Sequence, residues 1–338
     1  MKRTMNWVER AIVYGLLGVL FLIGIFLDLP ISQGLYAPDN LFGQIMELTA
    51  EIPVWVLILF SLALIVKFHP DFSKDWANIL FLTVVMTGGL FVAYYAGHHF
   101  LKLLNRVTHQ DLPSYLSFVY ALVYLAISCP WVFLLKEEHR REMMVFATLV
   151  IAMLGTTLLL MQGLKMLWLR PRFRTLMALG GEEAVSALWC PIYKINGFWN
   201  FDSSFSEAIL DERFGAGTVA SAMESLGIKE WAEEEFYAFP SGHTMHAVAP
   251  LMLCMASGFL PKMKGKEGYV RIPFYAWGIL AAVGRIVRGA HHLTDVTFGF
   301  FVAVIVFDMY SSYLEKPFLK LYDRFVEEGK VKTREKNA

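Results

Sequence analysis

Eight stretches of this chain are long and apolar enough to cross a lipid bilayer, and this pattern limits the possible folds more than any other feature. A helix needs about 20 apolar residues to span a hydrocarbon core of roughly 30 Å. Hydrophobic residues fill 56% of the 338 positions and charged residues only 18%, which exceeds what one water-soluble core requires. We therefore expect an all-α, polytopic transmembrane bundle. The predicted spans are 11–29, 53–68, 77–97, 115–135, 143–164, 243–260, 271–288 and 295–314.

The spans suggest three parts of unequal length. Residues 1–76 are expected to form two additional N-terminal helices, residues 77–314 a six-helix core, and residues 315–338 a cytoplasmic tail whose last ten or so residues are solvated and disordered.

The segment 173–240 falls outside the hydrophobic pattern and mixes acidic with aromatic residues. It is too long to be a simple connector. Within it, residues 206–214 and 218–226 are expected to form short helices, the second one bounded by Gly217 and Gly227. Two interpretations remain open for this insertion: an interfacial cap with aromatic side chains at headgroup level, or a lid that shapes the entrance for a lipid headgroup.

The distribution of Lys and Arg predicts the orientation, because cytoplasmic loops retain positive charge. The loop of residues 30–52 contains no Lys or Arg, and the loop of residues 98–114 contains only Lys102 and Arg106. Both loops would lie outside, so both termini would be cytoplasmic and the insertion 173–240 extracytoplasmic. We expect a bacterial inner membrane, and we expect the first apolar stretch to be a retained helix because no small-residue cleavage site follows it.

Charge and cysteine content exclude other classes of protein. The net charge is zero, so the footprint of a nucleic-acid-binding protein is missing. The three cysteines show no close spacing, which argues against a disulfide framework.

Three short polar patterns interrupt the apolar background in a fixed order. They are Lys165 with Arg172 seven positions later, then Pro240-Ser241-Gly242-His243, then Arg285 followed by His291 and Asp295. On the predicted topology, all three lie at the outer ends of their helices. Segments more than a hundred positions apart would therefore meet at one face of the membrane.

Each pattern suits one part of phosphoryl transfer. Lys165, Arg172 and Arg285 can stabilise the negative charge that spreads over the phosphoryl oxygens in the transition state. Ser241 is a good N-cap and Gly242 permits close approach of the backbone to an anion.

Two histidines complete the chemistry. His243 is placed to protonate the leaving oxygen, and His291 can attack phosphorus while Asp295 holds its second nitrogen.

These residues resemble the motifs of the type-2 phosphatidic acid phosphatases, a family of integral-membrane lipid phosphatases. The family pattern is Lys-x6-Arg-Pro, then Pro-Ser-Gly-His, then Ser-Arg-x5-His-x3-Asp. In this chain Phe173 replaces the proline after Arg172 and Gly284 replaces the serine before Arg285, while Pro240 to His243 is complete. Both departures lie at supporting positions.

The resemblance implies a role for each matching residue. His291 would be the nucleophile that forms a phosphohistidine, His243 the general acid, and Asp295 the residue that orients His291. Lys165, Arg172, Ser241, Gly242 and Arg285 would bind phosphate, with Arg170 as a possible addition. The implied reaction is hydrolysis of a phosphate monoester or pyrophosphate of a lipid at the outer leaflet, with no metal or other cofactor.

Other interpretations remain open from the sequence. The same fold could transfer the phosphoryl group to an acceptor lipid or sugar, and buried Arg and His residues are also found in polytopic transporters. Spacing alone would allow a metal cluster among His243, His246, His291, His292 and Asp295. The neighbouring basic residues argue against a cation there.

Overall fold

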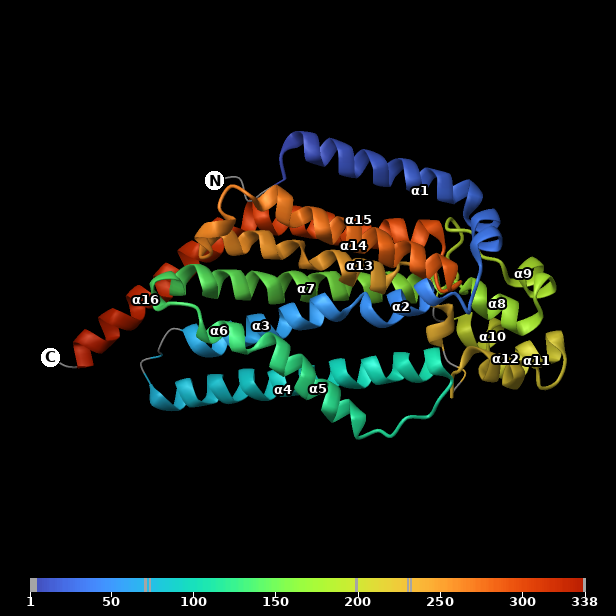
Figure 1. Ribbon diagram of the computed structural model, residues 1–338, viewed down its shortest axis with the longest axis horizontal. Helices are drawn as coiled ribbons and strands as arrows, with labels where there is room; N and C mark the ends of the chain where they lie inside the picture. The colour runs from blue at the N-terminus through green and yellow to red at the C-terminus, as the bar shows by residue number, and fades with distance from the viewer. Residues whose placement is uncertain are drawn as a thin grey trace.

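The computed structural model describes residues 5–69, 72, 74–197, 200–229, 231 and 233–336, and in these residues it is a bundle of long helices with a helical cap at one end (Figure 1). Within that part of the chain, seven helices are long and apolar enough to cross a membrane. They cover 7–35, 41–68, 75–108, 116–133, 137–168, 267–287 and 293–324. This confirms the predicted all-α polytopic fold.

The N-terminal half of the bundle contains α1 (Trp7–Leu35), α2 (Leu41–Thr49), α3 (Ile52–Phe68), α4 (Asp75–Thr108), α5 (Leu116–Ser128), α6 (Pro130–Phe133), η1 (Glu137–His139) and α7 (Arg140–Trp168). α4 packs along α5, and α3 packs against α7. Close approach of α4 to α5 depends on Gly97, because a Cβ there would lie 2.3 Å from the Ser117 carbonyl oxygen.

The C-terminal half completes the bundle. It contains α13 (Gly242–Val248), η4 (Ala249–Gly258), η5 (Pro261–Met263), α14 (Glu267–Val287), α15 (Leu293–Met309), η6 (Tyr310–Leu314) and α16 (Glu315–Lys336). The span predicted at 243–260 is a short α-helix that continues as a 3-10 helix from Ala249, with Pro250 at the change. Proline lacks the N–H that an α-helical interior needs, which accounts for the change at this point.

In the segment predicted as a tail, residues 315–336 form α16, so the disorder expected for the last ten or so residues is wrong as far as Lys336. Arg141 on α7 holds this helix through a two-pronged ion pair with Asp323, at 2.7 and 2.5 Å. The chain therefore continues past the last predicted span as a helix attached to the bundle.

The insertion between α7 and α13 forms the cap. It consists of α8 (Phe173–Gly180), α9 (Glu182–Leu188), α10 (Phe201–Ser204), α11 (Glu207–Phe214), α12 (Thr218–Leu226) and η3 (Glu233–Phe236). The last two α-helices confirm the short helices predicted at 206–214 and 218–226. The cap has its own apolar core, which includes Leu176, Leu210 and Phe236. Figure 1 shows that α1 begins and α16 ends at the opposite end of the bundle from the cap.

Candidate active site

Backbone hydrogen bonds join the three sequence motifs to one another beneath the cap. The N–H of Ala238 donates to the carbonyl of Arg170 at 3.0 Å, and the N–H of Ser241 donates to the carbonyl of Asp295 at 3.0 Å. The N–H of Arg174 donates to the carbonyl of Gly289 at 2.8 Å. The motifs therefore meet in one place, as the predicted topology required.

The first motif lies where α7 ends. Leu169 takes a left-handed conformation, φ 41°, directly after the last helical turn that carries Lys165. The chain then runs beside residues 235–238, with the N–H of Arg172 donating to the carbonyl of Glu235 at 3.2 Å. This change of direction places Lys165 and Arg172 on the same side of the site.

The second motif is a tight turn into α13. Ser241 is its N-cap, as predicted, and its hydroxyl accepts from the N–H of Thr244 at 3.4 Å. Gly242 is required by the packing, because a Cβ there would lie 2.7 Å from Met161 Sδ and 3.9 Å from Lys165 Nζ. The Lys165 ammonium group therefore lies close to this turn.

His291 has a different partner from the expected one. Its Nδ1 lies 2.6 Å from the carbonyl oxygen of Ala238, whereas Asp295 Oδ2 is 3.9 Å away. Asp295 is the third residue of α15, and its carboxylate turns back to accept the N–H of His292 at 2.7 Å. The hydrogen bond that holds the His291 ring comes from the chain preceding Pro240.

The environment of His291 favours a neutral ring. The side chain is buried, and burial holds its pKa well below the usual value, reinforced by the positive charges of Arg285, Arg172 and Lys165. A neutral ring that donates Nδ1–H to a carbonyl keeps the lone pair on Nε2. This is the form that a nucleophilic histidine needs.

Arg170 forms ion pairs and hydrogen bonds within the protein. Its guanidinium is fully buried and donates to Asp295 at 2.5 Å, Asp28 at 2.9 Å, Thr294 at 2.8 Å and the carbonyl of Cys190 at 2.8 Å. These bonds engage all three guanidinium nitrogens. The possible phosphate contact suggested for Arg170 is therefore replaced by a structural ion-pair network.

Two buried carboxylates balance the remaining arginines. Glu235 Oε1 lies 3.3 Å from Arg106 and 3.3 Å from Arg172, while Oε2 lies 3.4 Å from Arg174. Burial alone would raise the pKa of Glu235, but Arg172, Arg174 and Arg106 outweigh burial and hold it well below its usual range. The carboxylate is therefore charged at neutral pH.

Glu47 balances the positive charge of the arginines at the third motif. Its two oxygens lie 2.9 Å from Arg285 Nη1 and 2.9 Å from Arg288 Nε, and Arg174 Nη1 lies 3.4 Å away. Glu47 is 0% exposed. Arg174 thus links the carboxylates on either side of the site.

Several donors of the site remain without a partner among the described residues. Arg172 Nε, Arg285 Nε and His243 Nε2 are buried there and make no hydrogen bond. They come from three different motifs. Buried polar atoms are nearly always satisfied in folded proteins, so a group of orphaned donors indicates a place for an acceptor ligand such as an anion.

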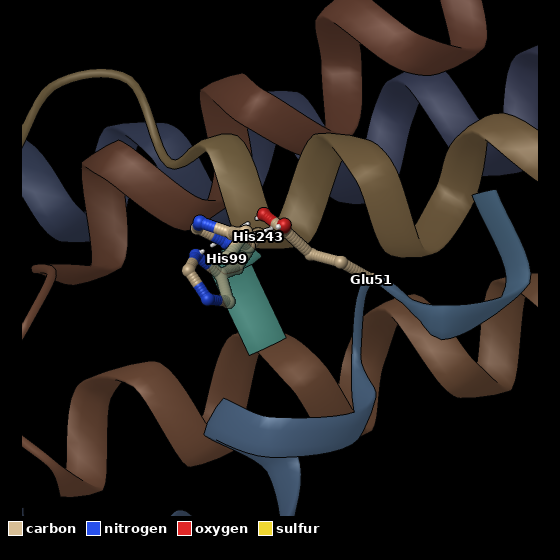
Figure 2. Close-up of side chains that lie close together, drawn as sticks. All are labelled: Glu51, His99 and His243. Carbon is tan, nitrogen blue, oxygen red and sulfur yellow. Dashed lines mark ion pairs between the residues drawn. The ribbon is translucent and has the colours of Figure 1, made fainter. Parts of the chain in front are cut away.

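The other ring nitrogen of His243, Nδ1, lies near the carboxylate of Glu51. This nitrogen lies 3.4 Å from Glu51 Oε1, and Glu51 also receives His246 Nδ1 at 3.0 Å and His99 Nε2 at 3.0 Å. Figure 2 shows His99 and His243 turned toward the Glu51 carboxylate. The Nδ1 side of His243 therefore faces a buried acid, and Nε2 makes no hydrogen bond within the part of the chain that the structure describes.

Comparison with known proteins identifies the family of this chain. The model of the PAP2 superfamily matches residues 146–317, just over half of the chain. The chain belongs to the PAP2 superfamily. A stretch of 102 residues is 29% identical to phosphatidylglycerophosphatase B of Bacillus subtilis (strain 168), covering 26% of this chain and 50% of that relative. The chain thus spans about half the length of this curated relative. No solved structure matches the chain.

Three acidic residues that sequence reasoning missed lie before the PAP2 match. Asp28, Glu47 and Glu51 lie in α1, in α2 and directly before α3, outside the matched residues and within the part expected to be an addition. One signal could have found them, because acidic residues in or beside apolar spans are costly and usually have a partner. The match covers residues 146–317, and the start of the core near residue 77 stays a prediction.

Glu235 provides a test of this PAP2 site. We expect Glu235→Gln to lower the free energy of unfolding by roughly 3–5 kcal/mol, because three buried arginines lose their charged partner. Thermal unfolding of the purified protein in detergent measures the change. The matched control is Glu234→Gln, whose exposed pair with Lys102 is worth at most about 1 kcal/mol.

The sign of the pH dependence follows from the lowered pKa of Glu235. Its contribution to stability is present above the unfolded value of about 4.3 and is lost as the pH falls toward the lower folded value. Equal losses in the two variants would contradict the assigned role of Glu235.

Proposed function

We propose that this chain is an integral-membrane lipid phosphatase that hydrolyses a phosphate monoester or pyrophosphate through a phosphohistidine intermediate. One observation carries the proposal: buried donor atoms of Arg172, Arg285 and His243, on three motifs that the backbone joins, make no hydrogen bond among the described residues, and burial lowers the pKa of the neighbouring His291. Membership of the PAP2 superfamily and the likeness to a phosphatidylglycerophosphatase support it.

The first step would form a bond between His291 Nε2 and phosphorus while the bond to the lipid oxygen breaks. The hydrogen bond to Ala238 fixes the ring with Nε2 as the attacking atom. Lys165, Arg172 and Arg285 stabilise the charge on the phosphoryl oxygens, and the turn at Ser241 and Gly242 supplies backbone contacts.

His243 would act as the general acid. Its Nε2 gives a proton to the departing alkoxide, and in the second step the same atom takes a proton from the water that attacks the phosphohistidine. Glu51 is a positioning residue in this scheme, because its carboxylate lies 3.4 Å from Nδ1 of His243 and favours a second proton on the ring, which burial and the charge of Arg285 oppose. Every step uses side chains of this chain.

Arg170 and Asp295 would act indirectly, without contacting the substrate. Their ion pair at 2.5 Å, together with the hydrogen bond from His292 N–H to Asp295, holds the start of α15 and therefore the neighbouring His291. In this proposal Asp295 positions the nucleophile through the backbone.

The nucleophile assignment predicts loss of turnover in His291→Ala. The purified variant should release no phosphate from a panel containing phosphatidic acid, phosphatidylglycerol phosphate, an undecaprenyl pyrophosphate and a lipid A phosphate. Wild-type protein quenched in alkaline detergent after mixing with phosphate-labelled substrate should carry base-stable, acid-labile label that the variant lacks. His139→Ala, at a histidine outside the site, is the control. Phosphate release by a folded His291→Ala protein would rule out the assignment, and label appearing on an added acceptor would favour transfer over hydrolysis.

The general acid predicts a dependence on the leaving group. His243→Ala should slow hydrolysis of a lipid phosphate about 10²–10⁴-fold, because an alkoxide leaves poorly without a proton. The burst of dinitrophenolate from dinitrophenyl phosphate, which reports the first step alone, should fall much less than the first step with a lipid phosphate, since that phenolate needs no proton. Glu51→Gln should show the same selectivity with a smaller loss. Parallel losses on both substrates would show that His243 has another role.

The orientation is also a proposal. Its support is that the site lies at the end of the bundle opposite the start of α1 and the end of α16 (Figure 1), and that Lys and Arg are scarce in the loop of residues 30–52. The termini would be cytoplasmic and the site would face the outer leaflet, in bacteria the periplasm. A C-terminal green fluorescent protein should therefore fluoresce in cells, while alkaline phosphatase at the same place should be inactive. The reverse pattern would place the site inside.

A further inference from the structure

One carboxylate in this protein is surrounded by three imidazoles from separate parts of the chain. Glu51 lies between α2 and α3, His99 lies on α4, and His243 and His246 lie on α13. The nitrogen to oxygen distances are 3.0 Å for His99, 3.4 Å for His243 and 3.0 Å for His246. Figure 2 shows the first three of these side chains together.

The spacing of these atoms suits a small metal ion. Zinc binds imidazole nitrogen and carboxylate oxygen at about 2.0–2.2 Å, so ligand atoms around a tetrahedral ion lie roughly 3.3–3.6 Å apart. In Glu51, His99 and His243, one ligand atom of each lies within 4.8 Å of the others. Small side-chain rotations would bring them to coordination distance, and His246 offers a fourth nitrogen.

The hydrogen bonding of the cluster is incomplete. His99 Nε2 is buried and lies 3.0 Å from the Glu51 carboxylate, but its geometry does not make a hydrogen bond. Glu51 is 7% exposed, and its ion pairs among the described residues are all with imidazoles. A buried carboxylate needs a compensating positive charge, which a bound ion would supply.

The ligand types select the class of ion. Imidazole nitrogens with one carboxylate favour zinc-like transition metals, whereas magnesium and calcium prefer oxygen ligands. The charges of Lys165 and Arg285 also act on this region and disfavour a cation. These two positive charges limit the affinity of the site for a cation, which favours reversible binding.

We propose that Glu51, His99 and His243, with His246 as the fourth ligand, form a reversible site for a zinc-class ion that inhibits the enzyme. On binding, the contacts that His243 Nδ1, His246 Nδ1 and His99 Nε2 make with Glu51 would be exchanged for bonds to the metal, and any proton held on those nitrogens would pass to water. The ring could then no longer carry protons on both nitrogens, so Nε2 would be a poorer donor to the leaving oxygen. Only this inhibitory consequence depends on the proposed function.

Cobalt binding tests the site without any turnover. Full-length protein in detergent, treated with chelator and dialysed, should bind one Co²⁺ per chain and develop the intense visible bands of a tetrahedral ion with nitrogen ligands. His99→Ala should raise the Kd for Co²⁺ at least about tenfold, since even loss of an indirect metal contact costs that much. His246→Ala is a second variant should the first not fold, and His139→Ala is the matched control.

Inhibition is measured separately. Zn²⁺ should reduce phosphate release by wild-type protein, and chelator should restore it. His99→Ala, referred to its own activity in chelator, should need at least about tenfold more Zn²⁺ for the same fractional inhibition.

The two measurements separate the possible failures. Absence of the cobalt bands, or bands of equal affinity in both ligand variants, would overturn the metal site and leave a hydrogen-bonded cluster. Cobalt bands without zinc inhibition would overturn the regulatory role. Cobalt bands in a protein that hydrolyses none of the lipid phosphates would refute the proposed function and keep the site.

Discussion

The site depends on a concentration of buried positive charge that carboxylates from outside the motifs must balance. Arg106, Arg172, Arg174, Arg285 and Arg288 gather around Glu47 and Glu235. Two unit charges 4 Å apart interact by about 4 kcal/mol at an effective dielectric constant of 20, so uncompensated arginines would repel one another strongly. Each carboxylate accepts several guanidinium groups while leaving Arg172 Nε and Arg285 Nε without a hydrogen bond among the described residues. Ion pairing therefore holds the cations in place and still leaves donors for an anion.

The cap contributes directly to this balance. Glu235 lies in η3, next to Phe236, which is fully buried in the cap's own apolar core. Residues 235–238 are in turn bonded to the backbone of Arg170 and Arg172. Movement of this segment would remove Glu235 from three arginines and the Ala238 carbonyl from His291. The segment of the insertion nearest the site is therefore held in place by the cap's core on one side and by the first motif on the other.

The membrane-spanning helices and the grouping of the three motifs were predictable from the sequence. The individual hydrogen-bond partners of the site residues were not. Apolar stretches define transmembrane helices because length and composition suffice. The motif residues could be grouped because their spacing and the topology place them at one end. The partner of His291 depended on finer geometry: Asp295 lies in the first turn of α15, where capping competes for its carboxylate. Arg170 shows the same limit, since the sequence cannot reveal that Asp28, 142 positions away, accepts from its guanidinium.

The N-terminal helices belong to the site although the family match leaves them out. Glu47 and Glu51 are four residues apart, about one helical turn, and lie on either side of the break between α2 and α3. Pro53 lies in the first turn of α3, where a missing N–H is tolerated, so the second helix starts anew at this point. One carboxylate faces the arginines that are proposed to hold phosphate, and the other faces His243. A single turn of chain thus contacts both the groups that would hold the phosphate and the group that would protonate the leaving oxygen. Replacing α2 and α3 would therefore alter the chemistry itself as well as the anchoring of the protein in the membrane.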